Sequence, residues 1–149
     1  MPDRVLIIAN ALVANARHSL PKSLRRDDDY AREVMVVAPM LTTRLQCLTS
    51  DIDAAHAAAE QRRRQIAADM STFRTPPLTT VGDENQLLAV ADALATFDAD
   101  ACVVVTHTRE HANYHEHGVP EQIYDQFRLP TTALTVDTHG RIVGHYGLT

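Results

Sequence analysis

The hydrophobic residues of this chain fall mostly in short unbroken runs, separated by longer segments in which apolar positions recur at helical spacing. Continuous runs rich in β-branched residues are typical of strands that helices cover on both faces. We therefore predict strands, in chain order, over residues 5–9, 33–39, 78–81, 101–106 and 131–136. The turn sequence at 137–140 allows residues 141–144 to return as a hairpin strand.

Three of the intervening segments carry helix signals. Ser50 or Asp51 can cap a long helix. The apolar stripe expected along that helix is Ile52, Ala55, Ala59, Ile66, Met70 and Phe73. A second helix is predicted after Asp83 and Gln86, which have the spacing of a capping box. Its expected apolar face is Leu87, Leu88, Ala91, Leu94 and Ala95.

A third, short helix is predicted from Pro120 to about Phe127, with the proline in its first turn. Residues 11–31 are interpreted as a short helix, a loop and a further turn near Leu24. Strands that alternate with helices in this way imply a parallel α/β sheet with right-handed crossovers.

We predict a three-layer sandwich with helices on both faces of a five-stranded parallel sheet in the order 3-2-1-4-5. In this order the runs 5–9 and 101–106 are adjacent central strands. The 149 residues are enough for one domain, 1–149. Ligands of such sheets bind outside the carboxyl ends of the strands, which directs the search for function to the segment that starts at Thr106.

Charge and composition narrow the possible partners. The formal net charge is −5, so no basic surface is expected for nucleic acid. The cluster Arg62–Arg64 lies in a helical pattern and is interpreted as a solvated helix face. The two cysteines have no disulfide or metal spacing, and the first residues resemble neither a signal peptide nor a membrane span. We expect a cytoplasmic protein that binds no membrane.

Eight sequence pieces, spread over nearly the whole chain except residues 11–31, follow one another in a recognisable order. They are residues 4–10 (RVLIIAN), 36–39 (VVAP), 50–55 (SDIDAA), 81–83 (VGD), 91–100 (ADALATFDAD), 105–107 (VTH), 127–131 (FRLPT) and 136–137 (VD). In these pieces the chain resembles the universal stress proteins, and within them a small actinobacterial branch. The resemblance implies a flavodoxin-like sandwich of the adenine-nucleotide α-hydrolase-like type. It also implies a role in the stress response.

Nucleotide-binding members of that family carry an acidic residue after the first strand and a Gly-x2-Gly-x9-Gly-Ser/Thr loop after the fourth. Here the acidic position is Asn10, and the three glycine positions are Thr106, Arg109 and His117, with Gly118 in the Ser/Thr position. The spacer at 110–116 is also shorter than in the family. The resemblance therefore predicts no resident cofactor and no high-affinity ATP binding, because the glycine amides that approach phosphates are missing.

The pocket that the resemblance leaves in place is expected to use the following residues as ligand-binding positions: Asn10, Thr106, His107, Arg109, Gly118 and Val119. Members of the family commonly dimerise through the last strand, here 131–136, so the resemblance predicts a homodimer. A return strand after residue 140 would cover that edge within one chain.

The histidine-rich loop at 107–117 has three interpretations. As a helix it would stack His107, His111 and His115 on one face, where a pair could chelate zinc with Glu110 or Glu116. As a solvated polar loop it would bind no metal, and our prediction is that there is no metal site. In the third interpretation Arg109 and the imidazoles bind a small anion.

The Gly82-Asp83 pair could contact a ligand, although a capping role for Asp83 explains the pair without one. We find no catalytic constellation, so an enzyme is not predicted. The leading hypothesis is a universal-stress-protein-like sensor or regulatory domain that binds a small anionic or nucleotide-related ligand weakly or not at all. The alternatives are a ligand-free module that docks to another protein, and a metal-dependent hydrolase using the histidine loop.

Overall fold

Nine elements of secondary structure are defined in the computed structural model, which describes residues 4–11, 13, 33–39, 52–69, 78–82, 85–107 and 118–148. In chain order they are β1 (Arg4–Ala9), β2 (Glu33–Pro39), α3 (Ile52–Asp69), β3 (Leu78–Gly82), α4 (Gln86–Thr96), β4 (Ala101–His107), α5 (Val119–Phe127), β5 (Thr131–Val136) and β6 (Ile142–Leu148). The interpretation of residues 11–31 falls almost entirely outside the described residues.

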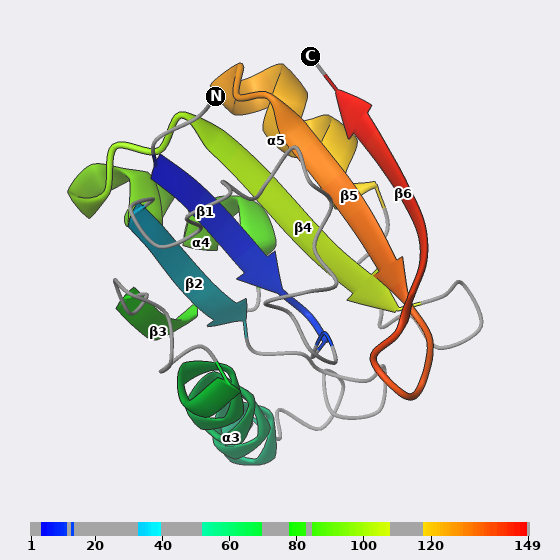
Figure 1. Cartoon of the computed structure of the whole chain (residues 1–149). Coiled ribbons are helices and arrows are strands. Elements are labelled where there is room, and N and C mark those ends of the chain that lie inside the picture. Colours follow the sequence, from blue (N-terminus) through cyan, green and yellow to red (C-terminus); the bar gives the residue numbers. More distant parts are fainter. Residues whose placement is uncertain are drawn as a thin grey trace.

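The described strands form a single mixed sheet in the order β3-β2-β1-β4-β5-β6 (Figure 1). Each neighbouring pair from β3 through β5 is parallel, whereas β6 runs antiparallel to β5. The α/β class is therefore confirmed. The prediction of a five-stranded, all-parallel sheet is met only in part, because a sixth strand extends the sheet.

The two central strands are the most apolar ones. β1 and β4 pair in parallel from Val5 opposite Ala101 to Ala9 opposite Val105. All residues from Val5 to Ala9 and from Ala101 to Val105 are buried. Burial on both faces accounts for their unbroken hydrophobic sequence, since neither side of these strands meets water.

Helices lie on both faces of the sheet (Figure 1). One hydrophobic cluster joins alternate residues of β1 and β4, such as Leu6 and Val104, to α4 and α5. A second cluster, on the opposite face, contains Ile7, Val103 and Ile66 of α3. The described part of the chain is thus layered as helix, sheet, helix.

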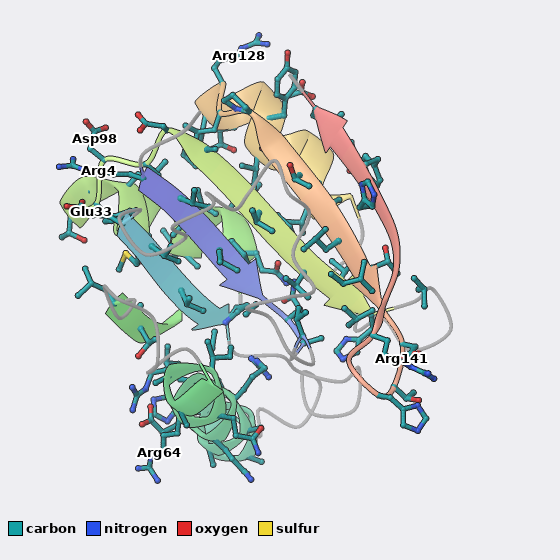
Figure 2. All side chains as sticks on the ribbon, in the orientation of Figure 1. Arg4, Glu33, Arg64, Asp98, Arg128 and Arg141 are labelled. Atoms are coloured by element: carbon teal, nitrogen blue, oxygen red, sulfur yellow. The ribbon has the colours of Figure 1, made fainter. Side chains whose placement is uncertain are left out.

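Helix α3 uses part of the predicted stripe. Ala59 and Ile66 are buried, whereas the side chains at 52, 55, 70 and 73 and the predicted cap at 50 or 51 lie outside the described residues. Arg63 and Arg64 both pair with Glu60 on the same helix. Figure 2 shows Arg64 directed away from the sheet, as expected of a solvated face.

Helix α4 corrects two predictions. Its N-cap is Asn85, whose side chain accepts from the backbone N–H of Leu87 at 3.1 Å and of Leu88 at 3.2 Å. Its buried positions are Gln86, Ala89, Val90 and Ala93, whereas Leu88 is 46 % exposed. The predicted face is only partly correct: Leu87 and Leu94 pack against the core cluster, whereas Leu88 and Ala95 are exposed. Because the helix is apolar almost all round, periodicity alone does not identify the buried side.

Strand β6 is the return strand that we considered as an alternative to a dimer contact, and it covers the edge of β5. It is longer than the predicted return strand and pairs with β5 from Thr131 opposite Leu148 to Val136 opposite Ile142. The phenol O–H of Tyr146 donates to Glu121 of α5 at 2.5 Å, and partial burial with this contact raises the pKa of Tyr146 to about 12. A dimer contact made directly by the edge of β5 is therefore excluded.

None of the helices in the described ranges is both long enough and apolar enough to cross a membrane.

Candidate functional site

The carboxyl ends of β1, β2 and β4 meet at one edge of the sheet (Figure 1). Asn10 follows β1 directly, and its backbone N–H donates to the carbonyl of Val105 at 3.1 Å. This bond extends the β1–β4 pairing by one step and fixes Asn10 beside the end of β4. The opposite edge is marked by Arg4 and Glu33, an exposed ion pair at 3.0 Å (Figure 2).

Only one of the two polar atoms in the side chain of Asn10 has a hydrogen-bond partner among the described residues. Asn10 is 1 % exposed, and its Nδ2 donates to Oε1 of Gln86 at 3.2 Å. Gln86 is itself buried and begins α4. Within the described part of the chain, Oδ1 of Asn10 is buried and has no hydrogen-bond partner. A buried acceptor in this state costs about 1–3 kcal/mol, so the atom calls for an explanation.

Thr106 lies in β4, as the predicted strand 101–106 has it, and β4 also includes His107, which we had assigned to the histidine-rich loop. His107 is the last residue of the strand and lies opposite Val136 of β5. The hydroxyl of Thr106 donates to the carbonyl of Leu134 at 3.5 Å. Both residues are half-buried, and both lie at the same edge of the sheet as Asn10.

The remaining predicted positions are distributed differently. Gly118 adopts a left-handed conformation with φ of 70° and precedes α5 without a side-chain cap. Val119 is buried in the core cluster with Ile123, so only its backbone is available to a ligand. Arg109 lies outside the described residues, as do His111 and His115. Within the described ranges no group of three His, Cys, Asp or Glu side chains is arranged to hold a metal ion.

Arg62 is a residue at this edge that the sequence analysis placed on a solvated face. Its Nε donates to the carbonyl of Ala9 at 2.9 Å, and a second guanidinium nitrogen donates to the carbonyl of Pro39. Because Ala9 and Pro39 end β1 and β2, Arg62 brings a positive charge to the side of the sheet where the carboxyl ends of the strands lie. We call this side the carboxyl edge. The sequence spacing could have predicted that Arg62 faces the sheet, since Arg62 shares a helical stripe with the buried Ala59 and Ile66.

Gly82 at the end of β3 has a packing role. A Cβ at this position would lie 2.5 Å from Cγ1 of Val37 and 3.0 Å from Cβ of Ala89. The glycine therefore allows α4 to approach β2 and β3 closely. Asp83 lies outside the described residues, and the observed cap is Asn85.

Comparison with known proteins adds no family assignment. No protein-family model matches the chain, and a search of curated proteins finds no match. The functional argument consequently depends on the geometry of the site and on the resemblance of the sequence pieces.

Proposed function

We propose that this chain is a universal-stress-protein-like regulatory or sensor domain with a flavodoxin-like, adenine-nucleotide α-hydrolase-like sheet. It binds a small anionic or nucleotide-related ligand weakly at the carboxyl ends of β1 and β4. The strand order supports this proposal, because ligands of parallel sheets bind where the order of strands reverses, here between β1 and β4.

The observation that carries the proposal is the unpaired Oδ1 of Asn10. This atom can only accept, so its partner must supply an N–H or O–H. The amino group of a nucleobase and the hydroxyl of a sugar both meet that requirement. The guanidinium of Arg62, held at the ends of β1 and β2, supplies the charge that attracts an anionic part of the same ligand.

Two features account for weak binding. Oδ1 of Asn10 is screened from solvent, so a ligand reaches it only after a local rearrangement, whose cost lowers the apparent affinity. Thr106 also replaces a glycine of the family's phosphate loop, and its Cβ hinders the approach of phosphate to the backbone. ATP is accordingly expected to bind with a dissociation constant above about 1 μM.

A melting experiment tests the proposal. Adenosine monophosphate at about 10 mM, with a dissociation constant near 1 mM, should stabilise the protein by roughly 1.4 kcal/mol and raise Tm by about 3–5 °C. Asn10→Ala should lose this rise, whereas Gln122→Ala, an exposed amide on α5, should keep it. An unchanged Tm in the native sequence, or an equal rise in Asn10→Ala, would reject the site.

The proposed assembly is a homodimer that forms through β6, the outer strand on this side of the sheet. Val143 and Tyr146 of β6 are 58 % and 47 % exposed. An edge strand with exposed apolar side chains favours pairing with another chain. Light scattering at micromolar concentration should give a dimer for the native sequence and for Leu78→Lys on β3, and a monomer for Val143→Lys. A monomeric native protein would refute this assembly.

The proposal places the domain in the cytoplasm. Cys102 is an unpaired thiol buried in β4, which is the usual state of cysteine in a reducing compartment.

A further inference from the structure

A groove separate from the carboxyl-edge site lies beside β3, the outer strand at the other end of the sheet. Its volume is about 400 Å³, within the range of small-molecule pockets. Its walls come from β2, β3, α3 and α4. In Figure 1, β3 lies at the free edge of the sheet, and α4 covers the rear face of the neighbouring strands.

The groove exists because small residues line its helical wall. Helix α4 presents Ala89, Asp92, Ala93 and Thr96 to it, at the spacing of one helix face. Ala89 and Ala93 belong to the core cluster that also contains Val37, and their short side chains add little bulk to the groove above that cluster. Met35 of β2 is half-buried and provides the apolar floor, while Val37 beside it is buried.

The polar groups of the groove offer acceptors. The hydroxyl of Thr80 donates to the carbonyl of Val81 at 3.4 Å, and that of Thr96 donates to the carbonyl of Ala93 at 3.3 Å. With each proton engaged, both oxygens present lone pairs. The carboxylate of Asp92 is exposed and has no hydrogen bond or ion pair with any described residue.

The charge of the groove is therefore complementary to a cation. Among the described residues, its lining includes Asp92 and His56 as ionisable groups, but no lysine or arginine. An anion would meet the Asp92 carboxylate without a compensating cation. A neutral alkyl group would gain only the apolar floor.

We propose that this groove binds a primary ammonium group carried on a short alkyl chain. The ammonium pairs with the carboxylate of Asp92 and donates to the hydroxyl oxygens of Thr80 and Thr96, while the chain covers Met35. Such a group occurs on free alkylamines and on lysine side chains, and both sources present the same chemistry to the groove.

Amide chemical-shift titrations of the ¹⁵N-labelled full chain test this inference. The probe n-pentylammonium should shift the amides of Gly82, Asp92 and Ala93, with dissociation at millimolar concentration. The neutral n-pentanol should bind at least about threefold more weakly, because exposed ion pairs contribute modestly, and pentanoate should cause no shift. A lysine pentapeptide with blocked termini forms the second arm. Equal binding by this peptide indicates a lysine side chain of a partner, and binding by pentylammonium alone indicates a free amine.

Asp92→Asn is the deciding variant, because Asp92 is exposed and the substitution keeps its shape. It should weaken pentylammonium binding roughly three- to fivefold. The matched control is Asp98→Asn, an exposed acid in the segment after α4 that does not line the groove (Figure 2). Equal binding in Asp92→Asn, equal shifts with pentanoate, or no shift with either amine source would each overturn the inference. None of these results bears on the carboxyl-edge site, which has different residues.

Discussion

The side-chain amide of Asn10 donates to the side-chain oxygen of Gln86 at 3.2 Å, which joins the residue after β1 to the first residue of α4. Both residues are buried. Their contact engages Nδ2 of Asn10 and leaves its buried Oδ1 without a hydrogen-bond partner among the described residues. The candidate site therefore depends on a helix start that is distant in sequence from β1.

Gln86→Ala should destabilise the protein by about 1–3 kcal/mol, because both polar atoms of the Asn10 amide then lack partners. Urea denaturation measures the change. The control Gln122→Ala, on the exposed face of α5, should stay within about 0.5 kcal/mol. Adding Asn10→Ala removes the amide that has lost its partner. The double variant should therefore lose less unfolding free energy than the sum of the two single variants. A Gln86→Ala variant as stable as the control would contradict the contact.

Gly82→Ala should cost about 1–3 kcal/mol through overpacking. The added Cβ would lie 2.5 Å from Val37, on a buried strand that cannot move freely. Gly144→Ala is the matched control, since a Cβ there meets nothing within 4 Å. Combining Gly82→Ala with Val37→Ala should recover part of the loss. Urea midpoints that are equal for the two glycine variants would show that the close approach of α4 is absent.

Acid sensitivity should depend on Glu60. Hydrogen bonds from Arg63, the largest cause, lower the pKa of Glu60 to about 2 from its ordinary value of 4.5. The stabilisation that the ionised Glu60 contributes to the folded protein is therefore present above pH 4.5 and is lost as the pH falls toward 2. Glu60→Gln should flatten the decline of unfolding free energy in that window. Identical pH profiles for Glu60→Gln and the native sequence would count against the paired geometry.

The thiol of Cys102 should react only when the protein unfolds. Burial in β4 raises the pKa of Cys102 to about 12, so the reactive thiolate is scarce at neutral pH. In a Cys47→Ser background, the rate of alkylation by iodoacetamide should rise with urea in parallel with the unfolded fraction. Rapid alkylation of the native protein would show that β4 is not the covered central strand.

The strands were the most predictable elements, for a physical reason. A central strand of a parallel sheet meets helices on both faces, so Val5–Ala9 and Ala101–Val105 must be continuously apolar. The predicted return strand was shorter than β6 because Gly144, His145 and Gly147 interrupt the apolar pattern of this strand. Its place at the edge requires less hydrophobic sequence, which weakens the signal.

The candidate site was only partly predictable. Asn10 and Thr106 could be located because Asn10 follows one apolar strand and Thr106 lies near the carboxyl end of another. The role of Arg62 was missed because its charge suggested solvent, although its spacing from Ala59 and Ile66 placed it toward the sheet. The unpaired atom of Asn10 depends on Gln86, 76 residues further along the chain. No local sequence pattern encodes such a contact.

The most direct test of the proposed ligand site is an amide chemical-shift titration of the ¹⁵N-labelled chain with adenosine monophosphate. We predict shifts at Asn10, Gln86, Thr106 and His107, with a dissociation constant above about 1 μM and with loss of the shifts in Asn10→Ala. The absence of shifts at the carboxyl ends of β1 and β4, or shifts there that persist unchanged in Asn10→Ala, would contradict the account.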